Sequence, residues 1–366
     1  MPNSLPKVPH NPNTDIVKLH YHDVTSADIT ALCTVVRDGW YNAFTDLAIW
    51  KGMYWLCYRR GTGHGAGNSV EVVLRSNDLR RWREVRDFES PAGIGDGCSA
   101  ADGHFCVTPD CLYLFIGTRN PTRSFVTWSD DGVKWSEPRP LRLDGDDHPY
   151  TWRVRWRDGR FYSAICHLEQ GERPLDLIVS NDGVDWSSHT SIVGREELPL
   201  YSEETELHWR PDGELWCVVR AENAAMYWSC PPYTKWEGGD LGAICDAPVI
   251  CESAGRTYLA GRVRLPGVVY SGYPAQLQGG AWEGQGNGTT GLYHLTKGSI
   301  ELIRHFPCGG DASYPGLIST EPGKLAISFY SDIAYWTGTV KPRYFSEWRY
   351  KSTECDIYLA ELNVPD

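Results

Sequence analysis

The stretch "SNDGVDW" at residues 180–186 is the best guide to the architecture of this chain, because the chain repeats it. Asn-Asp-Gly favours a tight turn between two strands. "SDDGVKW" stands at 129–135, and "SNDLRRW" at 76–82 keeps the Ser, Asp and Trp without the Gly. Steps of 53, 51 and 50 residues separate the closing tryptophans, Trp82, Trp135, Trp186 and, in "YWSCPPYTKW", Trp236. A period near 50 residues is typical of the blades of a β-propeller.

A second unit recurs between these turns: an apolar strand, a turn containing Gly or Asp, and an aromatic strand. Its six copies are "FTDLAIWKGMYWLCYRR" from 44, "ADGHFCVTPDCLYLFIGTR" from 101, "WRVRWRDGRFYSAICH" from 152, "ETELHWRPDGELWCVVR" from 204, "DAPVICESAGRTYLAGR" from 246 and "YPGLISTEPGKLAISFY" from 314. Each hairpin and the strand pair around a Trp turn would make a four-stranded antiparallel sheet, and radial repetition protects the sheet edges. The sequence therefore predicts an all-β, six-bladed β-propeller of four-stranded antiparallel blades.

The domain organisation follows from this repeat. We expect a flexible leader at 1–14 and a single propeller domain at 15–366. The ring would close where "DIVKLHYHD" at 15–23 joins the last strand, "DIYLAELN" at 356–363. A β-sandwich or two stacked β domains is the rival interpretation, but neither produces a period near 50 residues.

Composition narrows the class of protein. The chain has 37 Gly, 23 Pro, 16 Trp, 20 Tyr and only 3 Met, which is typical of a turn-rich, aromatic all-β protein. A formal net charge of −12 argues against a nucleic-acid partner. No apolar run reaches the roughly 20 residues of a membrane span, and the opening "MPNSLPKVPHNPNTD" lacks the apolar core of a secretory signal. We expect no membrane partner and a cytoplasmic location, or secretion if a signal has been removed.

The 12 cysteines do not suggest a disulfide framework. Cys57, Cys106, Cys166 and Cys217 lie in apolar strand-like runs, where Cys behaves as a small buried hydrophobe. No C-x-x-C pair or Cys/His cluster indicates zinc. We expect reduced thiols, no metal site and no cofactor.

The predicted hairpins bring two rows of residues to one rim of the ring, because the first strand's start and the second strand's end share an edge. The starts are Asp46, Asp102, Arg153, Glu204, Asp246 and the pair Asp311 and Tyr314. The ends are Arg59, Arg119, His167, Arg220, Arg262 and Tyr330. Guanidinium forks match carboxylates in a bidentate way. Four arginines at one rim of an acidic protein predict a pocket for an anionic ligand, and an acidic sugar fits best. Trp55, Trp152 and Trp336 could offer apolar faces to the sugar ring.

The S-x-D-x-G-x-x-W turn resembles the Asp box of the sialidase superfamily, whose catalytic domains are six-bladed propellers. "YRRGTGH" at 58–64, "TWRVRW" at 151–156, "EETEL" at 203–207 and "GGDASYPGLI" at 309–318 look like segments of bacterial sialidase-like proteins. The resemblance covers nearly the whole chain and implies a glycoside hydrolase, exo-acting on an acidic sugar.

The same resemblance implies roles for single residues. In sialidases an arginine triad holds the substrate carboxylate, a Tyr paired with a Glu attacks the anomeric carbon, and an Asp is the acid/base. Arg220 and Arg262 would belong to the triad, Tyr314 would be the nucleophile and Glu204 its base, and Asp46 or Asp102 the acid. Sialidases carry their first triad Arg in an Arg-Ile-Pro segment, whereas this chain has "AFTDLAIW" at 43–50, so Arg59 would substitute.

Two other functions remain open from the residues. A polysaccharide lyase acting on a uronate would use His64, His167 and Tyr314 as base and acid, with arginines neutralising the carboxylate. A non-catalytic glycan-binding propeller would need the pocket alone. Asp311, three residues before Tyr314, is a further catalytic candidate. An acidic oligosaccharide or glycoside is the expected partner in every case.

Overall fold

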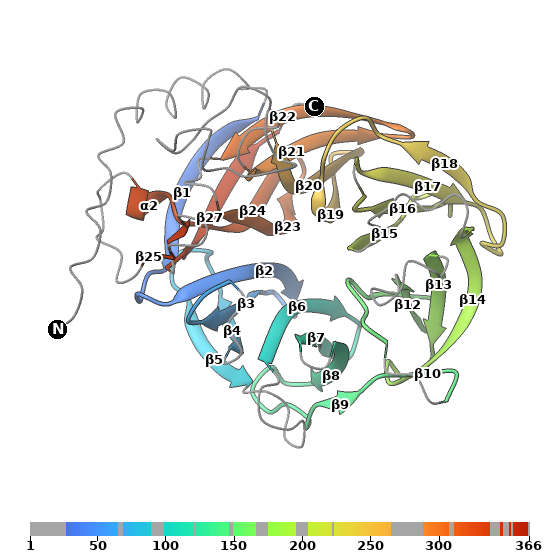
Figure 1. The fold of residues 1–366 in the computed structure, drawn as a ribbon, viewed down its shortest axis with the longest axis horizontal. Helices are drawn as coiled ribbons and strands as arrows, with labels where there is room; N and C mark the ends of the chain where they lie inside the picture. The colour runs from blue at the N-terminus through green and yellow to red at the C-terminus, as the bar shows by residue number, and fades with distance from the viewer. Residues whose placement is uncertain are drawn as a thin grey trace.

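The computed structural model of the chain describes residues 27–64, 69–88, 99–119, 122–145, 149–165, 175–194, 204–221, 223–264, 288–306, 311–336, 345–346, 351–352 and 354–364. Within them, six sheets stand around a central axis as the blades of a propeller, and β2, β6, β15, β19 and β23 lie nearest the centre (Figure 1). The prediction of an all-β, six-bladed propeller of antiparallel blades is confirmed.

The first three blades follow one another along the chain. The first consists of β2 (Tyr41–Trp50), β3 (Met53–Gly61), β4 (Val70–Ser76) and β5 (Arg83–Phe88). The second consists of β6 (Ser99–Val107), β7 (Leu112–Arg119), β8 (Arg123–Ser129) and β9 (Arg139–Pro140). The third consists of β11 (Arg155–Arg157), β12 (Arg160–Ile165), β13 (Leu175–Ser180) and β14 (Asp185–Val193), with β10 (Arg142–Leu143) added outside in parallel.

The remaining blades complete the ring. The fourth consists of β15 (Thr205–Trp209), β16 (Leu215–Val219), β17 (Ala225–Ser229) and β18 (Glu237–Asp240). The fifth consists of β19 (Asp246–Ser253), β20 (Arg256–Arg264), β21 (Gly288–Thr296) and β22 (Ser299–Phe306). The sixth consists of β23 (Ala312–Glu321), β24 (Lys324–Ser331), β27 (Asp356–Asn363) and β1 (Asp28–Val36). A short helix, α2 (Ile333–Trp336), and a small hairpin, β25 (Phe345–Ser346) with β26 (Lys351–Ser352), lie between β24 and β27.

An N-terminal strand closes the ring, but it is not the predicted one. β1 pairs with the outer edge of β27, and β24 occupies the other edge. The two candidate segments, "DIVKLHYHD" and "DITALCTVV", begin with the same Asp-Ile pair. The second alternates between exposed and half-buried side chains, as an outer strand must. Residues 1–26, including the predicted leader, lie outside the described part of the chain.

The repeated turn joins the two outer strands of a blade, as predicted. In "SNDGVDW", Asp182 Oδ1 accepts hydrogen bonds from the backbone N of Val184 (2.8 Å) and Asp185 (2.9 Å). Gly183 adopts φ 79°, a left-handed conformation that glycine adopts without steric cost. Leu79 holds the equivalent position in "SNDLRRW" at φ 60°. The turn therefore keeps its geometry without glycine because the Asp side chain still fastens it.

The closing tryptophans pack between neighbouring blades. Trp135 of the second blade contacts Trp55 and Phe88 of the first edge-on, and Trp186 of the third contacts Phe115 of the second. Trp55 is thus a packing residue, 2% exposed, and does not offer a face to a sugar. The turn motif builds the blade interfaces and takes no part in the pocket.

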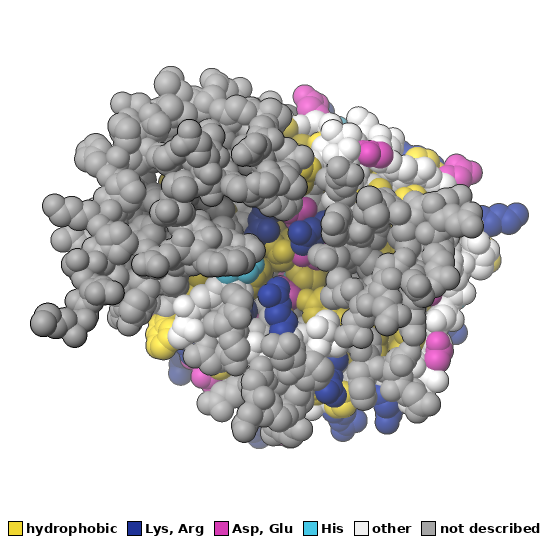
Figure 2. Space-filling model, in the orientation of Figure 1, with side chains coloured by type: hydrophobic (Ala, Val, Ile, Leu, Met, Phe, Trp, Pro, Cys, Tyr) yellow, Lys and Arg dark blue, Asp and Glu magenta, His cyan; other side chains and the backbone are white. Residues whose placement is uncertain are grey.

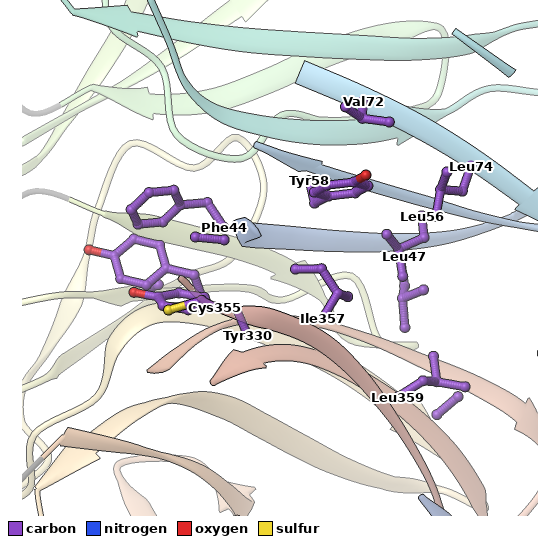
Figure 3. Close-up of a cluster of buried hydrophobic side chains, with 14 of the residues drawn as sticks. Phe44, Leu47, Leu56, Tyr58, Val72, Leu74, Tyr330, Cys355, Ile357 and Leu359 are labelled. Carbon is purple, nitrogen blue, oxygen red and sulfur yellow. The ribbon is translucent and has the colours of Figure 1, made fainter. Parts of the chain in front are cut away.

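The core is divided into clusters between the blades. The cluster between the first and sixth blades runs from Phe44, Tyr330 and Cys355 at one end to Leu74 and Leu359 at the other (Figure 3). The cysteines predicted to be buried thiols behave so where the structure describes them: Cys57, Cys106 and Cys217 are buried and form no disulfide. Cys166 lies outside the described residues. No helix in the described part of the chain is long and apolar enough to cross a membrane.

A buried ion pair ties the inner strands of different blades together. Arg153 Nη1 donates to Asp46 Oδ1 at 2.7 Å, Nη2 to the carbonyl of Pro315 at 2.7 Å, and Nε to that of Pro248 at 3.0 Å. The Arg153 side chain is 0% exposed and that of Asp46 is 4% exposed. The pair connects the first, fifth and sixth blades through a residue that precedes the third.

Arg153→Met is expected to lower the free energy of unfolding by about 3–5 kcal/mol, because it leaves the carboxylate of Asp46 buried without its cation. Urea unfolding measures the loss. The matched control is Arg142→Met, which breaks the exposed pair with Asp185 and should cost less than about 1 kcal/mol. Equal losses for the two variants would show that the buried pair has no special role.

Candidate active site

The pocket is built on a backbone irregularity that recurs at one position of three blades. The register of the first hairpin strand shifts between Ala43 and Asp46, between Asp246 and Val249, and between Ser313 and Gly316. The residues inside these shifts have positive φ: 56° at Phe44, 53° at Ala247 and 47° at Tyr314. Such bulges re-aim side chains, and strained backbone collects at functional sites. Tyr314 therefore occupies a position that the strand pattern alone would not give it.

Tyr314 and Glu204 form a hydrogen-bonded pair. The Tyr314 hydroxyl donates to Glu204 Oε1 at 2.7 Å, and the other carboxylate oxygen, Oε2, accepts from the backbone N of Ala247 at 2.6 Å. Tyr314 is 7% exposed and Glu204 is 6% exposed. The bulge at Ala247 thus orients the carboxylate that accepts the hydrogen bond of the Tyr314 phenol.

Two arginines flank this pair. Arg220 Nη1 donates to Glu204 Oε1 at 2.7 Å and lies 3.3 Å from the Tyr314 hydroxyl, while its Nε is 3.2 Å from Asp246 Oδ1. The Arg262 guanidinium lies over the Tyr314 ring, 4.6 Å from its centroid. The site therefore holds two permanent positive charges next to one phenol, one beside its hydroxyl and one over its ring.

The pKa of Tyr314 lies well above its usual range because the ring is buried and the Glu204 carboxylate is adjacent; Arg262 and Arg220 act in the opposite direction. Burial is the largest of these effects. Tyr314 is therefore a phenol at neutral pH, and it can act as a nucleophile only if a base removes its proton during attack. Glu204 is placed to be that base.

A second network lies beside the first, around Asp311. Tyr330 donates to Asp311 Oδ1 at 3.0 Å and Tyr41 donates to Asp311 Oδ2 at 2.7 Å. Arg262 Nη2 in turn donates to the Tyr330 hydroxyl at 2.8 Å. His64 Nδ1 lies 2.7 Å from the Tyr41 hydroxyl and 3.3 Å from Asp311 Oδ2. Asp311 is 1% exposed, so it orients the groups around it instead of facing a ligand.

A third group contains Arg59, Arg119 and Asp102. Arg59 donates to the backbone carbonyls of His64 (2.8 Å) and Gly63 (3.2 Å), so it fastens the segment that carries His64. Tyr150 donates a hydrogen bond to Asp102 Oδ2. Burial raises the pKa of Asp102 above its usual value, although Tyr150, Arg119 and Arg59 oppose the rise. Asp102 favours the protonated form more than an exposed carboxyl does.

The structure brings together most of the residues predicted for the rim but not all of them. Connected by contacts or charge in the described residues are Glu204, Tyr314, Arg220, Asp246, Arg262, Tyr330, Asp311, His64, Arg59, Asp102 and Arg119. Asp46 and Arg153 are bound to each other and buried, and thus do not line the pocket. His167 lies outside the described residues.

The misplacement of Asp46 has a geometric cause. The residue opposite Arg59 in the first blade is Ala43, just as Asp246 stands opposite Arg262 in the fifth. Asp46 lies on the far side of the register shift, opposite Cys57. Even spacing along a strand cannot show such a shift. The repeat therefore predicts Asp46 at the rim, whereas the residue at that position is Ala43.

Three residues of the site were missed at the level of sequence: Tyr41, Tyr150 and Phe44. Tyr41 and Tyr150 bind the carboxylates of Asp311 and Asp102, and Phe44 packs edge-on against Tyr314 with ring centroids 4.7 Å apart. Of the three, only Phe44 could have been predicted from the sequence, because it begins the first copy of the repeated hairpin as Tyr314 begins the sixth. Trp152 also packs against Tyr314, 5.7 Å between centroids, and is a buried support without an open face.

Glu71 is a buried carboxyl on β4 behind this group. It is 0% exposed, and a Cβ added to Gly103, the neighbour of Asp102, would stand 2.1 Å from Glu71 Oε1. Burial, and next the charge of Asp102, raise the pKa of Glu71 well above its usual range. The folded chain therefore holds Glu71 in its neutral form at a pH where an exposed Glu has lost its proton.

Glu71→Gln is expected to make stability less dependent on pH. Below the ordinary pKa of about 4.5, Glu71 is protonated in both the folded and the unfolded chain. Above it only the unfolded chain releases the proton, so the wild-type protein loses stability as pH rises toward the folded-state pKa. The variant should gain thermal stability relative to wild type between pH 5 and pH 8, by roughly 1.4 kcal/mol per pH unit at most.

The exposed Glu84, on the neighbouring strand β5, provides the control for this titration. Glu84→Gln should leave the difference from wild type flat across the same pH range. If the stability of Glu71→Gln relative to wild type instead stays constant or falls as pH rises, Glu71 is not neutral in the folded protein.

Side chains of Lys or Arg and a His gather around a hollow at the centre of one face of the propeller (Figure 2). Carboxylates lie among these cations, since Arg220 contacts both Glu204 and Asp246. In an acidic protein, guanidinium groups gathered in one hollow still offer donors to an anionic ligand. Among the residues that the structure describes, no group of three or more His, Cys, Asp or Glu side chains is arranged to hold a metal ion.

Comparison with known proteins places the fold. No family model matches the chain. A protein of unknown function from Dyadobacter fermentans is similar in structure, with 15% identity and a TM-score of 0.71 over 93% of this chain and 100% of that one. Phage phi92 endosialidase has 13% identity and a TM-score of 0.63 over 93% of this chain and 70% of its own.

Trypanosoma rangeli sialidase, in a complex with 2,3-difluorosialic acid described as a covalent intermediate, is similar at 13% identity with a TM-score of 0.56. The match covers 87% of this chain and 54% of that protein, so the chain spans about half of its length. Identities this low show the fold alone. The chain has the six-bladed propeller fold that sialidases and an endosialidase share.

Proposed function

We propose that the protein is a glycoside hydrolase of the sialidase type, exo-acting on a sugar that carries a carboxylate next to the scissile bond. The observation that carries the proposal is the Tyr314 hydroxyl, hydrogen-bonded to Glu204 at 2.7 Å and flanked by Arg220 and Arg262. A nucleophile, its base and two cations meet within one pocket. A binding module would need the cations but not the buried Tyr and Glu pair.

A phenol suits a sugar of this kind. The anomeric carbon of a keto-sugar acid already bears a carboxylate, which repels an anionic Asp or Glu nucleophile, whereas Tyr314 approaches as a neutral group. Arg220 and Arg262 would hold the sugar carboxylate in charge-assisted hydrogen bonds. The oxocarbenium character of the transition state is then stabilised by the phenolate that forms as Glu204 takes the proton.

The structural neighbours support this choice of substrate class. The T. rangeli sialidase is described with 2,3-difluorosialic acid as a covalent intermediate, and the phage protein is described as an endosialidase. In this chain a buried Tyr and Glu pair beneath two arginines offers the groups that covalent attack on such a sugar requires.

Turnover on a small panel of glycosides tests the proposal. The panel contains aryl ketosides of N-acetylneuraminic acid, aryl glucuronides, oligosaccharides containing uronate and the neutral aryl glucosides as a control. We expect release of the free acidic sugar from at least one carboxylate-bearing glycoside and none from the neutral ones. An ultraviolet signal of unsaturated uronate would identify a lyase instead, and tight binding of acidic sugars without any product would identify a binding module.

A further inference from the structure

The segment after β3 places a histidine beside the Asp311 network, with its ring nitrogen Nδ1 next to Tyr41 and Asp311. His64 Nδ1 lies 2.7 Å from the Tyr41 hydroxyl and 3.3 Å from Asp311 Oδ2. The Tyr41 hydroxyl itself lies 2.7 Å from Asp311 Oδ2. Arg59, held under the same segment, donates to the His64 carbonyl. Both the ring and the backbone of His64 are therefore positioned by the protein.

The hydrogen bonds determine which nitrogen of His64 carries the proton. Burial, and next the charge of Asp311, raise the pKa of Tyr41 well above its usual range, so Tyr41 keeps its single proton. That proton is donated to Asp311 Oδ2. The Tyr41 oxygen can then only accept from His64, so Nδ1 is the protonated nitrogen. Nε2, on the opposite side of the ring, becomes the nitrogen that takes up or releases a proton.

The His64 ring also lies near Tyr314, because both rings contact Phe44. The His64 side chain is 36% exposed, whereas that of its partner Asp311 is 1% exposed. The centroid of the Phe44 ring lies 5.4 Å from that of the His64 ring and 4.7 Å from that of the Tyr314 ring. A sugar lying on Tyr314 would thus meet His64 across the width of one phenyl ring.

We propose that His64 is the general acid and base of the hydrolysis, with Tyr41 and Asp311 as the residues that position it. The inference rests on the proposed function, because it assigns the proton donor for the same reaction. This assignment replaces Asp46 and Asp102, the two residues that the sequence suggested as the acid. Asp46 is bound to Arg153, and Asp102 is 4% exposed and bound by Tyr150.

The reaction balances with these groups alone. In the first step the Tyr314 oxygen bonds to the anomeric carbon and gives its proton to Glu204. The bond from that carbon to the leaving oxygen breaks, and the leaving oxygen takes its electron pair and a proton from Nε2 of the His64 imidazolium. In the second step water attacks the anomeric carbon and gives a proton to Nε2. The carbon's bond to Tyr314 breaks, and the phenolate recovers its proton from Glu204.

A comparison of two leaving groups that differ in their need for a proton tests the inference. An alkyl leaving group needs an acid, whereas a 4-methylumbelliferyl group departs without one. His64→Ala should therefore lose about 10²- to 10⁴-fold in kcat/KM on the methyl ketoside of N-acetylneuraminic acid and less than about tenfold on the aryl ketoside. Sodium azide, which needs no base, should accelerate turnover of the aryl ketoside by the variant and form the glycosyl azide. A purely structural defect would reduce kcat/KM on both substrates by the same factor.

Further variants separate the possible outcomes. Asp311→Asn and Tyr41→Phe should show the same selectivity in weaker form, and His64→Gln repeats the test if His64→Ala does not fold. The control is His189→Ala. His189 lies on the outer strand β14, where its exposed side chain contacts the carbonyl of Pro232, and its loss should leave kcat/KM on both substrates unchanged. Equal losses on both substrates for His64→Ala, or a selective loss for Asp102→Asn instead, would overturn the inference while leaving the hydrolase intact. A wild-type protein inactive on both ketosides would overturn the sialoside hydrolase and the inference together.

Discussion

Tyr314→Phe is expected to reduce kcat on a carboxylate-bearing aryl ketoside by about 10³-fold or more, with little change in thermal stability. The substitution removes one oxygen, the atom that bonds to the anomeric carbon in the proposed mechanism. The ring of Tyr314 keeps its contacts with Phe44 and Trp152, so the pocket retains its shape. Initial rates under saturating substrate measure the effect, and thermal unfolding checks the fold.

Glu204→Gln provides the companion measurement, because the Tyr and Glu act as a unit. Each single variant should cost nearly as much as the double variant, since removing either partner stops the same proton transfer. Tyr113→Phe, a ring packed against Trp128 outside the pocket, is the matched control and should retain wild-type rates. Independent, additive losses for Tyr314 and Glu204 would contradict their assignment as nucleophile and base.

Arg262→Met should weaken the binding of a carboxylate ligand far more than that of its neutral analogue. Loss of one partner of a buried charged pair costs about 2–5 kcal/mol, a factor of roughly 30 to several thousand in Kd. The suitable probe is 2,3-didehydro-2-deoxy-N-acetylneuraminic acid, compared with its methyl ester by calorimetry. Met keeps most of the volume of the arginine stem above the Tyr314 ring.

Arg262 is a cleaner test than Arg220, because Arg220 also contacts Glu204 and its removal would disturb the nucleophile's base. Arg142→Met, far from the pocket in an exposed ion pair, should leave both Kd values unchanged. An equal loss of affinity for the acid and the ester would contradict a carboxylate clamp and favour a packing role for Arg262.

The fold could be predicted from the sequence because its signals are local and repeated. The Ser, Asp and Trp of each turn recur about every 50 residues, and the same residues fasten a turn wherever they occur. Ring closure was harder, since the choice between residues 15–23 and Asp28–Val36 depends on which segment reaches β27. Pairing between the two ends of a chain leaves no local mark in either segment.

The site could be predicted only in part, for a comparable reason. Strand ends that share an edge predict the grouping of Arg220, Arg262, Glu204 and Tyr314. This rule still holds when the assumed register is wrong by a residue or two. Asp46 was misplaced because the bulge before it moves the strand relative to its partner. The role of His64 depends on its contact with Asp311, 247 residues away in the chain, which no spacing in the sequence reveals.

The most direct test of the account is covalent trapping on the proposed nucleophile. The protein is incubated with 2,3-difluorosialic acid. Attack at the anomeric carbon expels the fluoride at C2, and the fluorine at C3 slows the hydrolysis that follows, so the adduct accumulates. The labelled peptide is sequenced by mass spectrometry. The proposed mechanism predicts a sugar adduct on the Tyr314 oxygen in the wild-type protein and none in Tyr314→Phe. An adduct on Glu204, Asp311 or Asp102, or no adduct on a protein that cleaves the aryl ketoside, would contradict it.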